Sequence, residues 1–353
     1  MPKANLQTIE NKRGEVTFRK KLVNQHIGNT IVSPGEPNFF ENIRELQNRL
    51  TNTQTTFEKF LKRKLKLSPF LEIAAGEGFR SDLLVSRFRA QGFATDISQQ
   101  TLAADKIITQ ELKLNKYSIK ICCDAYNLPF LSNSFPFVFV ALSLHHFPDP
   151  APIIKEAARV LIPDGVFYFD EEPIKQGLNL NLWRRGYHLR WFEKILKYTL
   201  VLIWLSRIGK AEVEHGILEE TFPLSTWEKA LAPFYKAEVE ETVFPFKRKV
   251  KRVKSSSPHW IYPNWLTRLG LYLFGGGIEG LGQIKKSGKP KSFTNILEYL
   301  GCPNCREKTT LQPLKLVNSQ KLICRKCHVS YIKRAGVWII LEKRLEQKLY
   351  GTN

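Results

Sequence analysis

Short apolar runs alternate with helical segments between residues 70 and 170, and this alternation constrains the fold more than any other feature of the chain. The runs 93–96 and 119–124 have the length of buried strands, whereas 80–91 and 152–161 have the length and periodicity of helices. This order is typical of βαβ units, whose parallel strands carry helices on both faces. The sequence therefore predicts an α/β protein with a Rossmann-like, doubly wound and mostly parallel sheet.

The flanking segments have other patterns. Residues 39–61 repeat apolar side chains at three- and four-residue intervals, which predicts amphipathic helix, while residues 1–36 show no sustained periodicity. Two late strands are expected over 237–244 and 278–284, at least one of them antiparallel. We expect four parts: an N-terminal extension with amphipathic helices (1–66), a cofactor-binding core (67–175), a helical, basic segment with the final strands that caps the substrate (176–295), and a zinc ribbon (296–345).

The segment FLEIAAGEGFRSDLL, residues 70–84, has the composition of a ligand-binding turn. Glu72 ends a strand, and small residues follow at Ala74, Gly76 and Gly78, where they let the backbone turn tightly against a ligand. A dinucleotide fingerprint G-x-G-x-x-G would place Phe79 at the third glycine, where only a small side chain allows close helix–strand packing. The turn therefore favours a ligand without a pyrophosphate.

Acidic residues end the next two predicted strands. Asp96 follows Glu72 by 24 residues, at a position from which a carboxylate can accept hydrogen bonds from both hydroxyls of a ribose. Asp124 and Ala125 end the third strand, where a carboxylate can accept from an adenine amino group. The carboxyl ends of parallel strands share one edge of the sheet, so these residues are expected to line one site.

In this order of motifs, residues 65–175 resemble the class I S-adenosylmethionine-dependent methyltransferases of type 11. Ala74 stands where the family usually has its first glycine, and Pro136 stands where an aspartate commonly follows Ser-Phe. The resemblance implies S-adenosyl-L-methionine as cofactor, with contacts that we carry over position by position: Glu72 to the methionine end, Ala74, Gly76 and Gly78 along the cofactor, Asp96 to the ribose, Asp124 and Ala125 to adenine, and Leu142 near the methionyl amine.

Catalytic candidates follow the fourth strand. Methyl transfer from a sulfonium requires a nucleophile held in line in a dry site, and a base is needed only if that nucleophile is protonated. His145 and His146 are the candidate bases, although a histidine pair here can equally serve only to shape the pocket. The chain has neither the N-P-P-[YF] tetrad used on exocyclic amines nor a proline-cysteine loop for attack on pyrimidines.

Four of the six cysteines form two C-x-x-C pairs, Cys302/Cys305 and Cys324/Cys327, separated by 18 residues. Two such knuckles can place four thiolates around a structural Zn²⁺, with no coordination position left for water. Residues 296–342 also resemble the small zinc-ribbon proteins that bind and activate methyltransferases. That resemblance implies that the ribbon docks on the Rossmann core of the same chain, at a high effective concentration.

The net charge of +21 is unevenly distributed. Residues 67–173 carry 9 basic and 13 acidic side chains, whereas 174–300 carry 21 basic and 11 acidic ones, including the run KRKVKRVK at 247–254. An anionic partner such as a membrane surface, a glycan or RNA fits this surface, and an ordinary solvated surface fits it equally. The run 247–254 is accordingly either a phosphate-binding arm or a solvated loop.

The hypotheses for function and location follow from these features. The first is a methyltransferase for a small-molecule, lipid-linked or glycan acceptor, and the alternative is an RNA methyltransferase or a non-catalytic RNA-binding protein. Without a long apolar run or a signal-peptide h-region, the chain is expected in the cytoplasm, either free or at the periphery of an anionic membrane.

Overall fold

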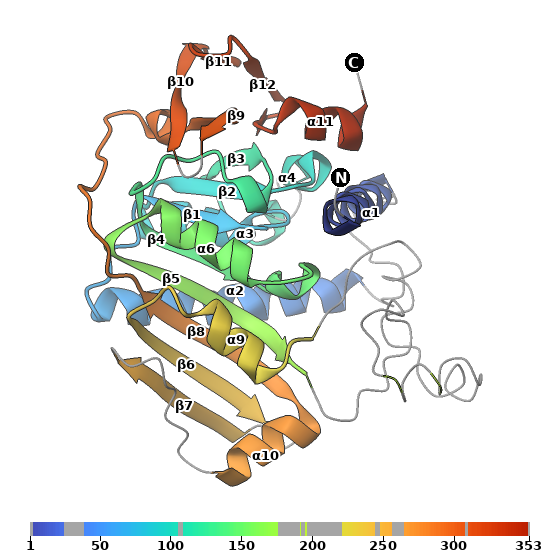
Figure 1. Ribbon diagram of the computed structural model, residues 1–353, viewed down its shortest axis with the longest axis vertical. Helices are drawn as coiled ribbons and strands as arrows, with labels where there is room; N and C mark the ends of the chain where they lie inside the picture. Colours follow the sequence, from blue (N-terminus) through green and yellow to red (C-terminus); the bar gives the residue numbers. More distant parts are fainter. Residues whose placement is uncertain are drawn as a thin grey trace.

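The structure is a computed structural model, which describes residues 3–24, 39–104, 109–175, 191, 195, 221–243, 248–255, 265–307 and 310–351 (Figure 1). The expected helical segment 176–220 therefore lies outside the described residues, apart from Trp191 and Ile195. In the part of the chain that is described, no helix is both long and apolar enough to cross a membrane.

The centre of the molecule is a parallel sheet. Its strands are β1 (Phe70–Ile73), β2 (Gly92–Asp96), β3 (Ile119–Cys122), β4 (Phe135–Ala141) and β5 (Leu161–Ile174). They lie in the order β5-β4-β1-β2-β3. From β1 the chain adds β2 and β3 on one side and then β4 and β5 on the other, so the strand order reverses between β1 and β4. In such sheets the crevice at the carboxyl ends of the strands, beside this reversal, is where ligands bind.

Helices cover both faces of this sheet, and β4 shows how the sequence encodes the two layers. Val138 and Val140 join a core that includes α6 and α9, while Phe137 and Phe139 join a second core that includes α2 and α3 (Figure 1). Because side chains alternate along a strand, a continuous apolar run supplies both cores. These helices and the short α4 are α2 (Phe39–Lys62), α3 (Phe79–Phe88), α4 (Gln99–Ala103), α6 (Ala151–Val160) and α9 (Leu224–Ala230).

Beyond β5 the sheet becomes antiparallel. Its strands here are β6 (Lys236–Val243), β7 (Arg248–Ser255) and β8 (Gly276–Gln283), and the helix α10 (Trp265–Phe274) lies between β7 and β8 in the chain. β8 inserts between β5 and β6, and β7 forms the outer edge. The basic run, of which Lys247 lies outside the described residues, is thus mainly a strand and not a loop.

A C-terminal unit, residues 296–351, extends the opposite edge. It contains η4 (Ile296–Tyr299), β9 (Gly301–Glu307), β10 (Thr310–Asn318), β11 (Lys321–Cys324), β12 (Ser330–Arg334), β13 (Val337–Ile339) and α11 (Lys343–Tyr350). Consecutive strands pair antiparallel, and β13 then pairs in parallel with β3, so that the described strands form one sheet of thirteen.

The N-terminal segment contains a helix that the sequence did not predict, α1 (Lys3–Asn24). Figure 1 shows it beside α4 and α11, at the carboxyl end of β2. Two short 3-10 helices, η1 (Ala125–Asn127) and η2 (Leu144–His146), follow β3 and β4. Together, α1, η1 and η2 surround the crevice of the sheet.

Candidate cofactor site and cysteine cluster

A cavity with about 750 Å³ of empty space lies at the carboxyl ends of the central strands. It is lined by Asn11, Lys12, Glu15, Arg19, Ala74, Thr95, Asp96, Ile97, Cys123, Asp124, Ala125, Tyr126, Ser143, His146, Phe147 and Pro148. Four of the residues expected to bind cofactor are in this lining, namely Ala74, Asp96, Asp124 and Ala125. The other four lie beneath or beside it.

Asp96 is held in place by backbone amides. Its two carboxylate oxygens accept from the N–H of Gly76 at 2.9 Å and from that of Ser98 at 2.8 Å. Burial raises the pKa of Asp96 to about 6, although the nearby Arg19 and these amides favour the charged form. Gly76 therefore contributes by orienting the acid that faces the cavity.

The turn after β1 requires unusual backbone conformations. Gly78 has φ +81°, a conformation that favours glycine, and a Cβ there would also lie 3.0 Å from Cβ of Ala94 and displace the ammonium of Lys120. Ala74, which replaces the usual glycine, has φ +53°, a conformation that L-residues rarely adopt. Lys120 donates to the carbonyl of Glu77 at 3.1 Å and pairs with buried Asp82 at 3.0 Å, which fixes the turn from below.

Glu72 lies under the turn and is not in the lining of the cavity. Its carboxylate accepts from the N–H and the hydroxyl of Ser81, at 3.1 and 2.5 Å, in the first turn of α3. Burial raises the pKa of Glu72 to about 7, against the effect of the nearby Arg80 guanidinium. In this structure Glu72 holds the start of α3 against β1.

The loop after β4 is organised by another buried acid, Glu172. It accepts from the N–H groups of Ser143, Leu144 and His145 at 2.8–3.1 Å. Its second oxygen also lies 2.9 Å from Nδ1 of His145. His145 is thus occupied in shaping η2, and of the two histidines only His146 lines the cavity.

Asp124 and Ala125 lie at the other end of the cavity. Asp124 accepts from the N–H of Tyr126 at 3.1 Å and pairs with Lys12 of α1 at 2.6 Å. Lys12 also lies 4.9 Å from the centre of the Tyr126 ring, within cation–π range. The end of β3 therefore offers a carboxylate, a small residue and an aromatic ring to a planar group.

Leu142 lines a second hollow, which has about 1480 Å³ of empty space. This hollow lies between α2 and the ends of β5 and β8, and its lining includes the carboxylates of Asp170, Glu171 and Glu279. Ala74 and Leu142 directly follow β1 and β4, Glu171 lies at a register shift within β5, and all three have positive φ. Such strain in residues other than glycine is concentrated at functional sites.

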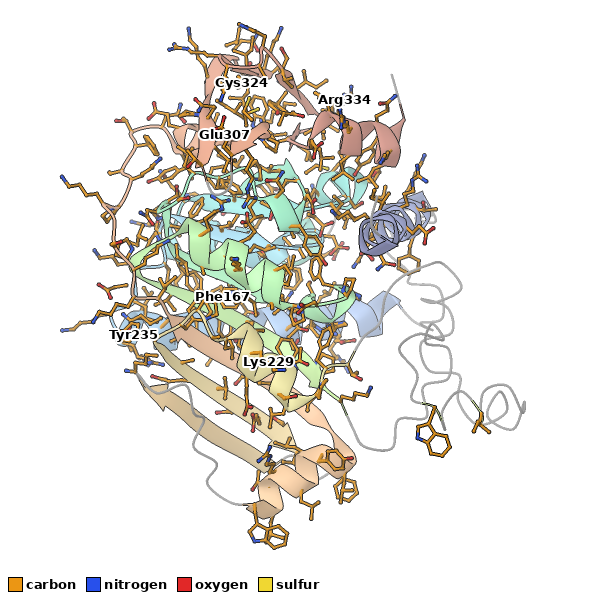
Figure 2. The ribbon with its side chains drawn as sticks, in the orientation of Figure 1. Phe167, Lys229, Tyr235, Glu307, Cys324 and Arg334 are labelled. Carbon is orange, nitrogen blue, oxygen red and sulfur yellow. The ribbon has the colours of Figure 1, made fainter. Side chains whose placement is uncertain are left out.

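The four late cysteines meet in one cluster, in the unit labelled by Cys324 in Figure 2. Their sulfur atoms all lie within 4.8 Å of one another, and the pairs Cys302/Cys327 and Cys305/Cys324 are each 3.7 Å apart. A tetrahedral Zn²⁺ with four thiolates at about 2.3 Å requires sulfur atoms roughly 3.8 Å apart. The donor set and its spacing therefore suit zinc, whereas a disulfide needs a much shorter separation of about 2.05 Å.

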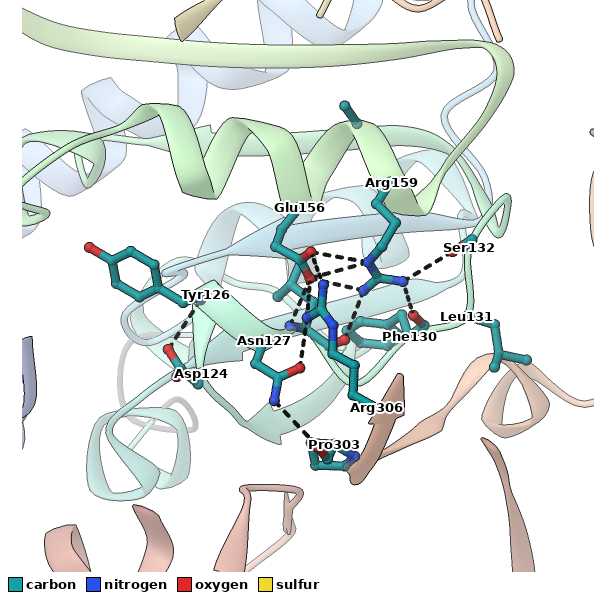
Figure 3. A network of polar contacts seen from close by, with 12 residues as sticks. Asp124, Tyr126, Asn127, Phe130, Leu131, Ser132, Glu156, Arg159, Pro303 and Arg306 are labelled. Carbon is teal, nitrogen blue, oxygen red and sulfur yellow. Dashed lines mark hydrogen bonds and ion pairs between the residues drawn. The ribbon is translucent and has the colours of Figure 1, made fainter. Parts of the chain in front are cut away.

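Arg306, next to the cysteine cluster, connects the C-terminal unit to the central domain (Figure 3). It donates to both oxygens of Glu156 on α6 and, at 2.7 Å, to the side chain of Asn127 in η1. Burial alone would raise the pKa of Glu156, but hydrogen bonds from Arg306 and Arg159 hold it below its usual range. Asn127 belongs to the same short helix, η1, as Ala125 and Tyr126, which line the cavity. The contact of Arg306 therefore reaches the helix that forms part of the cavity wall.

The residues that the sequence did not reveal include those of α1 and Lys120. A lysine in the buried strand β3 was a usable signal, since a buried ammonium requires acceptors. The α1 residues gave no such signal, because helix 3–24 places charged side chains, and no apolar stripe, toward the cavity.

Comparison with known proteins places residues 71–169 in a family described as "Methyltransferase domain". The match covers the five strands of the parallel sheet as far as Phe169. The ubiquinone/menaquinone biosynthesis C-methyltransferase of Rickettsia typhi is 30% identical over 140 residues, covering 38% of this chain and 52% of that protein. The tocopherol O-methyltransferase of Arabidopsis thaliana is 25% identical over 195 residues, 54% of each chain.

The chain thus spans about half the length of these curated relatives. Among solved structures, the geranyl diphosphate C-methyltransferase of Streptomyces coelicolor has a TM-score of 0.45 and 12% identity, covering 77% of this chain and 98% of that one. The family match supports the expected resemblance of residues 65–175 to a methyltransferase domain, and the sheet has the expected Rossmann-like order.

Proposed function

We propose that the chain is an S-adenosylmethionine-dependent methyltransferase with a small-molecule acceptor. The observation that carries this proposal is the convergence of Ala74, Asp96 and Asp124 on one cavity of a methyltransferase domain. When bound there, the cofactor supplies a methyl group that is already activated on a sulfonium. The protein has to bind it, orient the acceptor and exclude water.

The residues divide this task by position. Asp96 binds the ribose, Asp124 and Ala125 bind adenine, and the turn at Ala74 lies along the methionine portion. We assign the hollow at Leu142 to the acceptor, because it begins where β4 ends and continues between α2 and β8. His146 is the candidate base for an acceptor hydroxyl, since it lines the cofactor cavity and His145 does not.

For the acceptor we favour a lipid, because the relatives carry names of quinone and tocopherol methyltransferases. Helix α10 supports this choice. Trp265 and Tyr272 on α10 are 70% and 60% exposed, and Leu269 and Leu273 are also exposed. The helix contacts β6, which pairs with β7, a strand whose eight residues include five lysines and arginines. Exposed aromatic and aliphatic residues on one helix, in a chain with a net charge of +21, suit the interface of an anionic bilayer.

We also infer a structural Zn²⁺ on the four cysteines, in a ribbon that stabilises the methyltransferase domain in cis. The parallel pairing of β13 with β3 and the contacts of Arg306 with Glu156 and Asn127 support this role. They connect the metal knuckle to the strand and the turn that carry Asp124 and Ala125. A ribbon in the same chain needs no separate subunit to bind there.

The activity is tested with methyl-labelled S-adenosylmethionine and three acceptor fractions: a lipid extract of the source cells, their polar metabolites and their RNA. We expect label in the lipid fraction, and none after the protein is heated. Label in RNA alone would instead support the RNA methyltransferase. If the protein does not bind S-adenosylhomocysteine, the proposal that the chain is an S-adenosylmethionine-dependent methyltransferase is refuted.

Membrane contact is tested by sedimentation with vesicles of phosphatidylcholine, with and without phosphatidylglycerol. We expect binding to the anionic vesicles, reduced about tenfold or more in the double variant Leu269→Asp/Tyr272→Asp, since burial of one such side chain contributes about 1.5–3 kcal/mol. Val317→Asp is the matched control, because Val317 is 52% exposed on β10, far from α10 in Figure 1. If the double variant sediments like the parent, or if RNA and not vesicles retains the protein, α10 is not a membrane surface.

A further inference from the structure

Helix α1 supplies one wall of the cofactor cavity. Asn11, Lys12, Glu15 and Arg19 line the cavity, and the spacings of three and four residues from Lys12 through Glu15 to Arg19 place these on one face of the helix. None of these positions was expected to bind cofactor. Three of the four are charged, so this wall can interact with charged groups of a ligand.

One end of this wall lies at the adenine end of the cavity. Lys12 pairs with Asp124 at 2.6 Å and lies over the ring of Tyr126. An α-helix rises about 1.5 Å per residue, so Arg19 lies roughly 10 Å farther along the same wall. Arg19 is therefore well separated from the contact of Lys12 with Asp124.

Arg19 is partly buried and lines the same cavity as Ala74, the first residue after β1. Its Nε donates to Glu15 at 2.8 Å. Burial by itself would lower the pKa of Arg19, but surrounding carboxylates, with Glu77 and Asp96 among them, raise it above its usual value. Glu77 belongs to the turn between Gly76 and Gly78, and Asp96 faces the ribose position. Arg19 and Ala74 line the same cavity, so the guanidinium shares that cavity with the turn along which the methionine portion is expected.

We propose that Arg19 binds the α-carboxylate of the amino-acid end of S-adenosylmethionine. This rests on the proposed function and adds a residue to its binding site. A guanidinium can donate two parallel hydrogen bonds to a carboxylate, and it keeps its charge in a partly buried site. Glu15, paired with Arg19, fixes the guanidinium along the cavity wall.

The proposal is tested with two ligands that differ in the group in question. S-Adenosylhomocysteine has the amino-acid end, and 5′-methylthioadenosine has the same nucleoside without it. By calorimetry, Arg19→Ala is expected to weaken binding of S-adenosylhomocysteine roughly 10- to 150-fold, as for loss of a charged hydrogen bond. Its affinity for methylthioadenosine should stay within about twofold, and Arg19→Lys should recover part of the loss for S-adenosylhomocysteine.

Arg13→Ala is the matched control on the same helix. Arg13 is exposed, lies outside the cavity lining and donates to the carbonyl of Lys348 at 3.0 Å, so both affinities should remain near those of the parent. If Arg19→Ala weakens both ligands equally, Arg19 only positions α1, and the proposal is overturned; an unchanged affinity overturns it as well. If the parent chain binds neither ligand, the proposed function fails together with it.

Discussion

Replacing Cys305 by serine is expected to unfold the C-terminal unit while the methyltransferase domain retains its secondary structure. Structural Zn²⁺ contributes about 10–16 kcal/mol to the folding of zinc-finger peptides at neutral pH, and a serine hydroxyl is a poor substitute for a thiolate. Cys302 and Cys324 are fully buried in a core shared with the central sheet, so the loss should reach the β3–β13 pairing. Amide hydrogen exchange of 301–341 should show this as lost protection.

Metal analysis provides the companion measurement. The parent chain should contain one zinc per molecule, and Cys305→Ser should contain much less. Lys326→Ala is the matched control, since Lys326 lies between Cys324 and Cys327 but its side chain is exposed and pairs only with exposed Glu307 among the contacts described. A parent chain without metal, or a Cys305→Ser protein with full amide protection, would contradict the zinc site.

Asp96→Asn is expected to weaken binding of S-adenosylhomocysteine by about 1.5–3 kcal/mol, roughly 10- to 150-fold, as hydrogen bonds between the carboxylate and the ribose hydroxyls are lost. The parent should also lose affinity as the pH falls through about 6. Burial raises the pKa of Asp96 to about that value, and the protonated acid is the weaker acceptor. In the variant this pH dependence should be absent.

Calorimetry at pH 5, 6, 7 and 8 measures both effects. Asp164→Asn is the control, because Asp164 is an exposed aspartate of the same domain, outside the cavity lining. Equal affinity of Asp96→Asn and the parent at pH 8 would remove Asp96 from the cofactor site. A pH profile that survives in the variant would assign the titration to another group, with Glu72 as the next candidate.

The sequence predicted the elements whose residues repeat a local pattern. In β4, Val138 and Val140 belong to one core, and Phe137 and Phe139 belong to the other, because helices cover both faces of the strand. Buried strands of this kind are recognisable in the sequence as short apolar runs. The site could be predicted where function imposes a residue type at a strand end, as at Asp96 and Asp124. Glu72 was placed by resemblance, and in the structure it supports α3 from beneath the cavity.

What could not be predicted depends on contacts between distant parts of the chain. Arg306 and Glu156 are 150 residues apart, and each has an ordinary composition around it. Helix α1 presents Lys12 and Arg19 to a cavity, so it lacks the apolar stripe by which amphipathic helices are detected. The charges of residues 247–254 do not reveal a strand, yet the backbone of β7 pairs with β6 over its whole length.

The meeting of α1 with α11 has a consequence for synthesis. Arg13 and Lys348 are in contact although 335 residues separate them, and β3 obtains its neighbour β13 from the same late part of the chain. During translation β3 remains an unpaired edge until β13 has been synthesised. Helix α1 likewise lacks its contact with α11 until residue 348 has been synthesised. Unpaired strand edges and long-range contacts favour aggregation of nascent chains. A ribosome that stalls within residues 310–340 should therefore release a chain prone to pair through β3 with other copies.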